Sequence, residues 1–367
     1  MNKITQKIIC DVDRGNMFAV LKNFHLQIKD SVSLAESVDF QKNFSISNII
    51  VNGLGGSAIG GDLVRSYLHY KLKIPFFINR NYFLPAYANK STLSIISSYS
   101  GNTEETISAY KESLKKRCKI LAISSGGEVE KIAKKNGNLF IKIPGGYQPR
   151  CALGYSFFTL YISLFKLGLI KVSRKNFYKE IFSVISNIER FSRIFSNYES
   201  KKNITINIAS IIKDKLVIIY SSNDLLDVVN LRWRGQISEN AKQLAYGNLY
   251  PEMNHNELVG WWNSNETGIK KKNLNSDRRS FLNEIVVIFL KDDEDYERIK
   301  IRMDITSELY RKLASNVIDI KGKGNNKLER IFNLVYTGDW ISYYLAILRK
   351  IDPTPVDAIT YLKSKLK

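Results

Sequence analysis

Two loops in this 367-residue sequence are rich in small polar residues, and each directly follows a short apolar run. Residues 53–57 read Gly-Leu-Gly-Gly-Ser, and residues 98–103 read Ser-Tyr-Ser-Gly-Asn-Thr. An amphipathic helical pattern follows each loop, so backbone N–H groups at a helix N-terminus should face any anion bound there. Glycine allows close backbone approach, and hydroxyls add donors without charge. The pattern predicts a site for a compact phosphate, with these candidate ligands: Gly56, Ser57, Ser98, Ser100 and Thr103.

Two better-known phosphate motifs fit this stretch less well. It is not a P-loop, because no Gly-Lys-Ser/Thr follows the glycines. Residues 53–55 begin like a dinucleotide fingerprint, and Ala58 at the third glycine position is tolerated. A dinucleotide oxidoreductase therefore remains an alternative, although a pyrophosphate site does not require the second, hydroxyl-rich loop.

Three further residues could move protons or stabilise charge. Glu239 opens the segment Glu-Asn-Ala-Lys, and His255 lies in Pro-Glu-Met-Asn-His-Asn. A lone Glu or His is usually structural, but carboxylate and imidazole are the groups that exchange protons near neutral pH. Arg150 ends a loop with two prolines and two glycines and precedes a helical pattern, where the helix dipole does not stabilise a cation. We therefore expect Arg150 to serve a ligand. A phosphate site, an arginine, a carboxylate and a histidine are the parts that enediol chemistry requires.

No pattern of metal ligands is present. The three histidines and three cysteines are scattered without ligand spacing, so we predict no metal and no cofactor.

Strand-like and helical patterns alternate through the chain. In the first half we expect strands at 46–52, 74–78, 93–97, 119–124 and 139–143, with helices at 7–37 (one or two), up to about 69, 103–116 and 129–135. Residues 155–213 are mostly helical in pattern. In the second half we expect strands at 215–220, 285–289 and 317–320, with helices near 224–244, 295–314, 327–350 and 356–365, and a solvated loop at 263–280. This alternation predicts an α/β fold with parallel sheets between helices, and ligands at the carboxyl ends of the strands.

The two polar loops resemble the SIS (sugar isomerase) domain, which binds phosphosugars. The segments around Arg150, Glu239 and His255, together with residues 338–344 and 352–356, resemble the bifunctional phosphoglucose/phosphomannose isomerase family. The resemblance implies two doubly wound SIS-type domains, at 1–155 and 201–367, joined by a helical bridge at 156–200. It also implies a homodimeric, metal-free isomerase of carbohydrate metabolism, in glycolysis and gluconeogenesis. Such an enzyme interconverts glucose 6-phosphate and mannose 6-phosphate with fructose 6-phosphate through a cis-enediol.

Roles for individual residues follow from the same resemblance. Glu239 would shuttle a proton between C1 and C2, and Arg150 would stabilise the enediolate. His255 would open the sugar ring and would come from the neighbouring subunit. Thr354 and Lys363 would be polar groups of the C-terminal region that face the sugar, Lys363 as a catalytic group.

Three alternatives to the bifunctional enzyme stay open, one of which is the dinucleotide oxidoreductase considered above. A monospecific glucose- or mannose-phosphate isomerase would share every motif and differ only in pocket shape. A non-catalytic phosphosugar-binding regulator would share the loops, but Glu239, His255 and the lack of a DNA-binding pattern argue against it.

The composition is that of a globular protein, with 44% hydrophobic and 25% charged residues. The formal net charge is +20, but its lysines are spread along the chain without a nucleic-acid-binding motif, so we expect no nucleic-acid partner. No apolar run is long enough for a membrane span, no signal-peptide pattern is present, and Cys10, Cys118 and Cys151 are widely separated. These features predict a cytoplasmic protein with reduced thiols.

Overall fold

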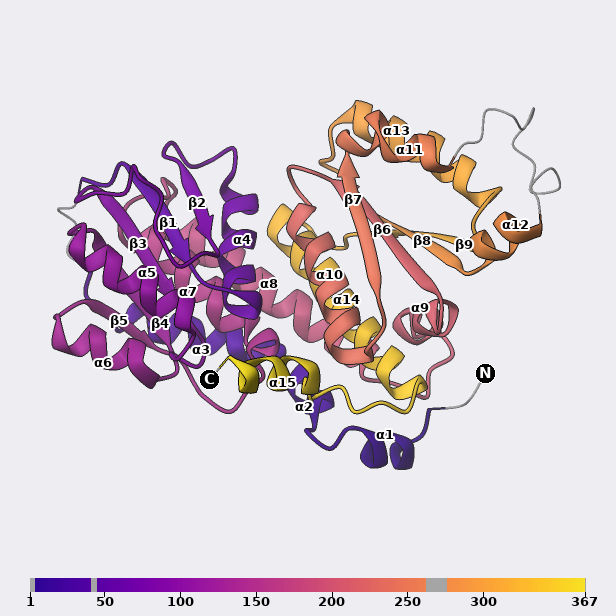
Figure 1. The fold of residues 1–367 in the computed structure, drawn as a ribbon, viewed down its shortest axis with the longest axis horizontal. Coiled ribbons are helices and arrows are strands. Elements are labelled where there is room, and N and C mark those ends of the chain that lie inside the picture. Colours follow the sequence, from indigo (N-terminus) through magenta and orange to yellow (C-terminus); the bar gives the residue numbers. More distant parts are fainter. Residues whose placement is uncertain (1–3, 41–44, 262–275, 367) are drawn as a thin grey trace. The chain divides into compact units, whose positions relative to one another are not determined.

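The computed structural model describes residues 4–40, 45–261 and 276–366. The chain divides into two compact units. The first unit is residues 23–186, and the second unit combines residues 1–22 with 187–367. Each unit contains one parallel sheet (Figure 1).

The sheet of the first unit has five parallel strands in the order β2-β1-β3-β4-β5. In chain order its strands are β1 (Asn48–Asn52), β2 (Phe76–Asn79), β3 (Thr92–Ser97), β4 (Lys119–Ser124) and β5 (Leu139–Lys142). Its helices are α3 (Phe24–Glu36), α4 (Gly55–Leu68), α5 (Glu104–Lys115), α6 (Gly127–Lys135), the 3₁₀ turn η1 (Pro149–Cys151), α7 (Leu153–Lys166) and the first part of α8 (Arg174–Phe195).

Helices cover both faces of this first sheet. On β1, Ile50 faces Ala109 of α5, whereas its neighbour Val51 contacts Gly61 of α4. This alternation is what a strand buried on both faces requires, and it explains why β1 is apolar throughout its centre.

The second unit has a four-stranded parallel sheet in the order β7-β6-β8-β9. Its strands are β6 (Leu216–Ser222), β7 (Ala245–Tyr250), β8 (Ile285–Lys291) and β9 (Asn316–Lys321). Its helices are α1 (Gln6–Val12), α2 (Met17–Lys22), α9 (Ile204–Ile212), α10 (Asp227–Ala241), η2 (Glu252–His255), α11 (Glu257–Trp261), α12 (Ser276–Asn283), α13 (Glu297–Arg311), α14 (Lys327–Leu348) and α15 (Asp357–Lys365).

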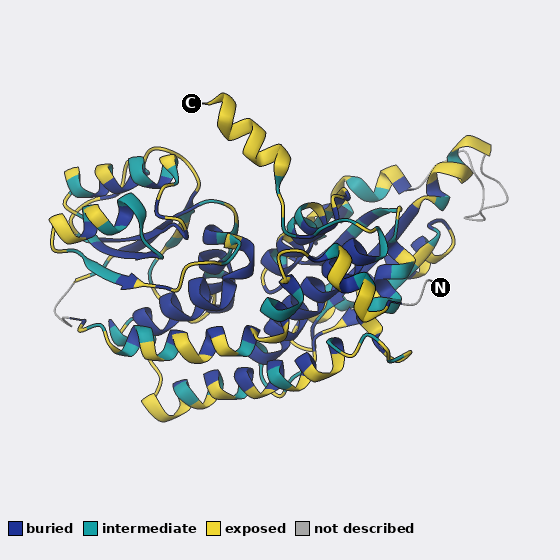
Figure 2. Ribbon diagram, turned by 90° about the horizontal axis from the view of Figure 1, so that it is seen from below, coloured by how far each residue is buried: buried dark blue, intermediate teal, exposed yellow. Residues whose placement is uncertain are grey.

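Two helices that follow each other in the second unit, α14 and α15, differ strongly in burial. Helix α14 is buried along nearly its whole length, whereas α15 has no buried residue (Figure 2). Helix α14 packs against α10, and the indole N–H of Trp233 donates to the carbonyl of Leu334 at 2.9 Å. A buried ion pair between Arg232 and Asp339, at 2.8 Å, joins the same two helices.

These observations confirm the predicted α/β fold with two parallel sheets flanked by helices. The predicted strands agree with the observed ones to within about two residues at each end, but β7 was not predicted. It is an edge strand whose middle reads Tyr-Gly-Asn, so it lacks an apolar run. The helix expected at 224–244 is shorter, because Lys242 adopts a left-handed conformation (φ 52°) that ends α10.

Two other expectations need correction. The segment 7–37 forms three helices, because Asp13 accepts hydrogen bonds from the backbone N–H groups of Met17 and Phe18, both at 2.8 Å, and so starts α2 as a separate element. Part of the loop expected at 263–280 is helical, since α12 begins at Ser276; residues 263–275 lie outside the described residues.

Two general findings concern the described residues. No helix among them is long and apolar enough to cross a membrane. Cys10, Cys118 and Cys151 form no disulfide bond.

Candidate active site

The first polar loop connects the carboxyl end of β1 to α4. Gly53 is packed so closely that a Cβ atom there would lie 2.7 Å from the carbonyl oxygen of Ser97, at the end of β3. Gly55 has φ +50°, a conformation that side chains disfavour. These two glycines therefore let the loop turn sharply between two strands and begin the helix, as the sequence pattern predicted.

Ser57 ties the first polar loop to the second. It is 9% exposed, and its Oγ accepts a hydrogen bond from the backbone N–H of Tyr99 at 2.9 Å. Its carbonyl accepts one from Ser97 Oγ, also at 2.9 Å. Because the Ser57 hydroxyl acts as an acceptor toward Tyr99, its own proton can be donated to a ligand.

The second polar loop holds the other predicted hydroxyls. Ser98 is fully buried, and its Oγ lies 3.0 Å from Oγ1 of Thr103, the N-cap residue of α5. Ser100 is exposed, and its Oγ accepts from the N–H of Asn102 at 3.3 Å. The structure thus brings Ser57, Ser98 and Thr103 to neighbouring loops at the carboxyl edge of the sheet.

Tyr99 is a site residue that sequence reasoning did not single out. Its hydroxyl donates to the carbonyl of Pro144 at 3.0 Å and accepts from the N–H of Tyr147 at 2.8 Å. Burial raises the pKa of Tyr99 above its ordinary value, which keeps the phenol protonated for this donation. Tyr99 therefore links the second polar loop to the loop that leads to Arg150. Its place between two serines of the motif was the only available signal.

Arg150 lies beside the first polar loop. It occupies η1, three residues before the start of α7, and is 3% exposed. A Cβ atom on Gly56 would lie 2.6 Å from the backbone nitrogen of Arg150 and 2.6 Å from the carbonyl carbon of Pro149. Gly56 is therefore required for close packing of the arginine turn on the start of α4. Arg150, Gly56 and Ser57 therefore lie close together in the first unit.

Glu239 lies in the second unit, in the last turn of α10, and is half-buried. Two cations hold this end of the helix. Arg349 donates to the carbonyl of Ala241 at 2.6 Å and to Asp214 at 3.0 Å, and Asp214 lies two residues before the start of β6. Glu239 is thus at the amino edge of the second sheet.

Lys242 joins the same helix end to the C-terminal turn. Its Nζ donates to the carbonyls of Glu239 and Pro355, each at 2.7 Å, and to that of Asp352 at 3.3 Å. Thr354 lies within this turn and also packs against Gly15, where a Cβ atom would approach its Oγ1 to 2.1 Å. Lys242 therefore holds the turn that precedes α15 close to the helix turn that carries Glu239.

Lys363 lies on α15 and is exposed. The apolar side chains of this helix are exposed too: Ile359, Tyr361 and Leu362 are 43%, 66% and 58% exposed. Helix α15 starts directly after the turn held by Lys242, and this turn lies at the end of the second unit that carries Glu239. Lys363 therefore belongs to a helix that begins at that end.

His255 lies at the opposite edge of the second sheet. It ends η2, which follows the carboxyl end of β7, and its side chain is exposed. Met253 of η2 is buried in the core with Tyr250, which fixes this turn at the carboxyl edge. The six residues of β7 stand between the ends that carry Glu239 and His255, and six residues of strand span roughly 20 Å. One copy of this unit therefore does not bring Glu239 and His255 together.

Within the described ranges, no group of three or more His, Cys, Asp or Glu side chains is arranged to hold a metal ion.

Comparisons with known proteins identify relatives of this chain. Residues 201–366 match a family model described as the bacterial phospho-glucose isomerase C-terminal SIS domain, in agreement with the predicted second SIS-type domain. The chain is 41% identical over 351 residues to a bifunctional phosphoglucose/phosphomannose isomerase of Caldicellulosiruptor bescii, covering 95% of this chain and 98% of that protein. A protein of the same name from Aquifex aeolicus is 34% identical over 320 residues, covering 87% and 90%.

A solved structure has the same fold at much lower identity. It is a glucose-6-phosphate isomerase-like protein from Thermus thermophilus, with a TM-score of 0.61, 15% identity, and coverage of 96% of this chain and 97% of that one.

Proposed function

The chain belongs to the family of bifunctional phosphoglucose/phosphomannose isomerases, and we propose on this basis which of its residues perform the reaction. The activity is that of an aldose–ketose isomerase, which interconverts glucose 6-phosphate and mannose 6-phosphate with fructose 6-phosphate. The phosphate binds at the two polar loops of the first unit. Backbone N–H groups at the start of α4, with hydroxyls of Ser57, Ser98, Ser100 and Thr103, supply donors for its oxygens.

The isomerisation itself needs one base and one charge stabiliser. The Glu239 carboxylate removes the proton from C2 of the open-chain aldose while the C1 carbonyl oxygen takes up a proton, which yields a cis-enediol. Glu239 then returns its proton to C1, and the C2 hydroxyl loses its proton as C2 becomes the carbonyl of the ketose. Arg150 stabilises the negative charge that develops on the oxygens of the intermediate. The observation that supports this role best is the packing of the Arg150 turn on Gly56, which fixes the arginine beside the phosphate loop.

Both epimers can share this chemistry. Glucose 6-phosphate and mannose 6-phosphate differ only at C2, and that carbon is planar in the enediol. Rotation about the C2–C3 bond presents either face of C2 to Glu239. Thr354 and Lys363 contact the sugar from the C-terminal turn and from α15, and Lys363 supplies a proton donor near the sugar oxygens.

The active site combines residues of two copies of the chain. His255 opens the sugar ring by protonating the ring oxygen, and it comes from the partner in a homodimer. The separation of Glu239 and His255 across β7 supports this arrangement, and so does the exposed imidazole of His255. The enzyme works in the cytoplasm, where its three free cysteines remain reduced. It needs no metal or other cofactor, and it binds neither nucleic acid nor membrane.

The experiment that tests the function is conversion of each sugar in excess EDTA. Glucose 6-phosphate and mannose 6-phosphate are supplied separately, and fructose 6-phosphate is measured. We expect both to be converted at the same rates with and without the chelator. Conversion of one sugar alone would show a monospecific isomerase. If neither is converted while fructose 6-phosphate still binds, the chain is a phosphosugar sensor.

A further inference from the structure

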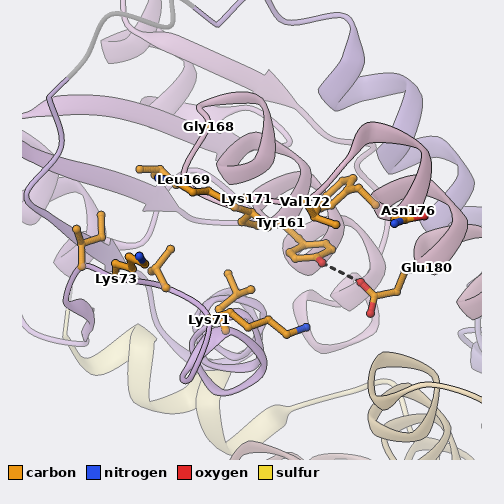
Figure 3. Close-up of a pocket in the computed structure, with 14 residues that line it drawn as sticks. Lys71, Lys73, Tyr161, Gly168, Leu169, Lys171, Val172, Asn176 and Glu180 are labelled. Carbon is orange, nitrogen blue, oxygen red and sulfur yellow. Dashed lines mark hydrogen bonds between the residues drawn. The ribbon is translucent and has the colours of Figure 1, made fainter.

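The first unit has a recess that lies away from the polar loops. It measures about 540 Å³ and is formed by the end of α4, the loop before β2, the end of α7 and the start of α8 (Figure 3). The phosphate loops lie at the N-terminal end of α4, whereas the recess lies at its C-terminal end. A helix of 14 residues spans about 20 Å, so the two places are distinct.

Most of the wall of this recess is apolar. The apolar side chains that border it come from two helices and two loops: Leu68, Leu72, Ile74, Ile170, Val172 and Phe177. Phe177 and Leu68 are buried, whereas the loop residues are partly or fully exposed. Exposed apolar surface in a concave recess of this size is typical of a ligand site.

Lysines interrupt the apolar residues in the same way on both loops. One loop reads Leu72-Lys73-Ile74, and the other reads Ile170-Lys171-Val172. Lys73 and Lys171 are both exposed and border the recess, and neither forms an ion pair with another described residue. Each of the two loops that border the apolar recess thus contributes one exposed lysine to its lining.

The one acidic side chain among the residues that line the recess already accepts hydrogen bonds from two tyrosines. Glu180 accepts a hydrogen bond from the hydroxyl of Tyr161 at 3.0 Å through one oxygen (Figure 3) and from the hydroxyl of Tyr67 through the other. Lys71 Nζ donates to the Tyr67 hydroxyl at 2.8 Å, so a third ammonium group is held at this side. The recess therefore presents three lysines against one carboxylate, and both oxygens of that carboxylate already accept hydrogen bonds.

From this arrangement we propose that the recess binds a small amphipathic anion, with a carboxylate or phosphate head and a short hydrocarbon body. The head lies between Lys73 and Lys171, where opposite charge is favoured, and the body lies against the apolar wall. The volume is within the range of sites for small organic ligands, roughly 300 to 1,000 Å³. The proposal does not depend on the isomerase assignment.

The test uses calorimetric titration of the full-length protein with octanoate and octyl phosphate, below their micelle concentrations. Octylammonium and 1-octanol carry the same body with a cationic or neutral head. We expect both anions to bind once per chain, with or without saturating fructose 6-phosphate, and the two controls to bind at least about tenfold more weakly. The ratio of octanoate to octyl phosphate affinity separates a carboxylate ligand from a phosphate ester.

Variants locate the site. The double variant Lys73→Glu/Lys171→Glu should weaken octanoate binding at least about tenfold and keep wild-type isomerase activity, which shows that it is folded. Lys175→Glu is the matched control, because Lys175 is an exposed residue of α8 that does not border the recess. Four results would overturn the proposal: no binding of either anion, equal binding of octylammonium, an equal loss in the Lys175 variant, or displacement of octanoate by fructose 6-phosphate.

Discussion

Glu239 is the single residue on which the proposed proton transfer depends. It lies in the last turn of α10, half-buried, and its backbone carbonyl accepts a hydrogen bond from Lys242. The residue is thus held by its own helix end and not by a flexible loop. Such fixed placement is what a base needs to reach both C1 and C2 of one substrate.

Replacement of Glu239 by Gln should abolish turnover and leave binding intact. The amide keeps the size of the side chain but does not accept the C2 proton, so kcat should fall about a hundredfold or more, while fructose 6-phosphate still binds. Steady-state kinetics and calorimetry measure the two effects separately. Glu308→Gln, an exposed residue on α13, is the matched control. Near-wild-type turnover in the Glu239 variant would remove this residue from the mechanism.

Ser57→Ala should mainly raise KM. The variant loses one donor to the phosphate, and hydrogen bonds to charged groups contribute about 1.5–3 kcal/mol, so KM should rise about tenfold or more. It also loses the acceptor for the Tyr99 N–H. Ser125→Ala controls for that second loss, because Ser125 Oγ donates to the Tyr99 carbonyl at 2.6 Å but is not among the proposed phosphate ligands. An equal rise of KM in both variants would mean that Ser57 acts only by positioning Tyr99.

At the scale of elements, the sheets and most helices could be predicted because their sequence patterns are strong. The strands of the first sheet are apolar runs that end in small polar residues, and this placed Gly56, Ser57 and Ser98 correctly at the carboxyl edge. Strand β7 was not predicted, and the reason is physical. It is an edge strand, and Gly247 is there because a Cβ atom would lie 2.2 Å from the carbonyl oxygen of Ile219 on β6.

The strand that was not predicted lies between two of the candidate site residues. Glu239 and His255 are sixteen positions apart in the sequence. Strand β7 separates them to opposite edges of the sheet. The motifs single out Glu239 and His255 as candidates, but the separation of these residues depends on the pairing of β7 with β6, which no local pattern encodes.

Gly56→Ala tests the packing of η1 on α4. The added methyl group would meet backbone atoms of Pro149 and Arg150 at 2.6 Å, so the arginine turn must move. We expect kcat to fall and the free energy of unfolding to drop by about 1–3 kcal/mol. Gly145→Ala is the control in the same loop region, since its Cβ atom would find its nearest neighbour at 3.9 Å. A fully active, stable Gly56 variant would show that this contact does not position Arg150.

Lys242→Met tests the link between α10 and the C-terminal turn. The variant keeps the length of the side chain and loses its hydrogen bonds to the carbonyls of residues 239, 352 and 355. Amide hydrogen exchange should therefore accelerate in residues 352–366, and kcat should fall more than KM rises. Lys350→Met replaces an exposed lysine that is close in sequence to this turn, and it should leave the exchange rates and kcat unchanged. Unaltered exchange in the Lys242 variant would show that the turn is held by other contacts.

At the scale of the whole molecule, the proposed site residues are distributed over both units. The first unit holds the two polar loops and Arg150, and the second holds Glu239 at one edge of its sheet and His255 at the other. Within one copy of the second unit, Glu239 and His255 therefore lie at different places. The proposed homodimer, in which each copy supplies His255 to the other, accounts for this separation.

The most direct measurement is the activity of purified mixed dimers. A dimer of one Glu239→Gln chain and one His255→Ala chain has one site with both residues intact, if His255 acts on the partner, and should recover about half of wild-type activity. The inverse pairing, a wild-type chain with a chain that carries both substitutions, should then be inactive, because each of its sites lacks one residue. Inactivity of the first pairing together with about half activity of the second would contradict the account and show that Glu239 and His255 act within one chain.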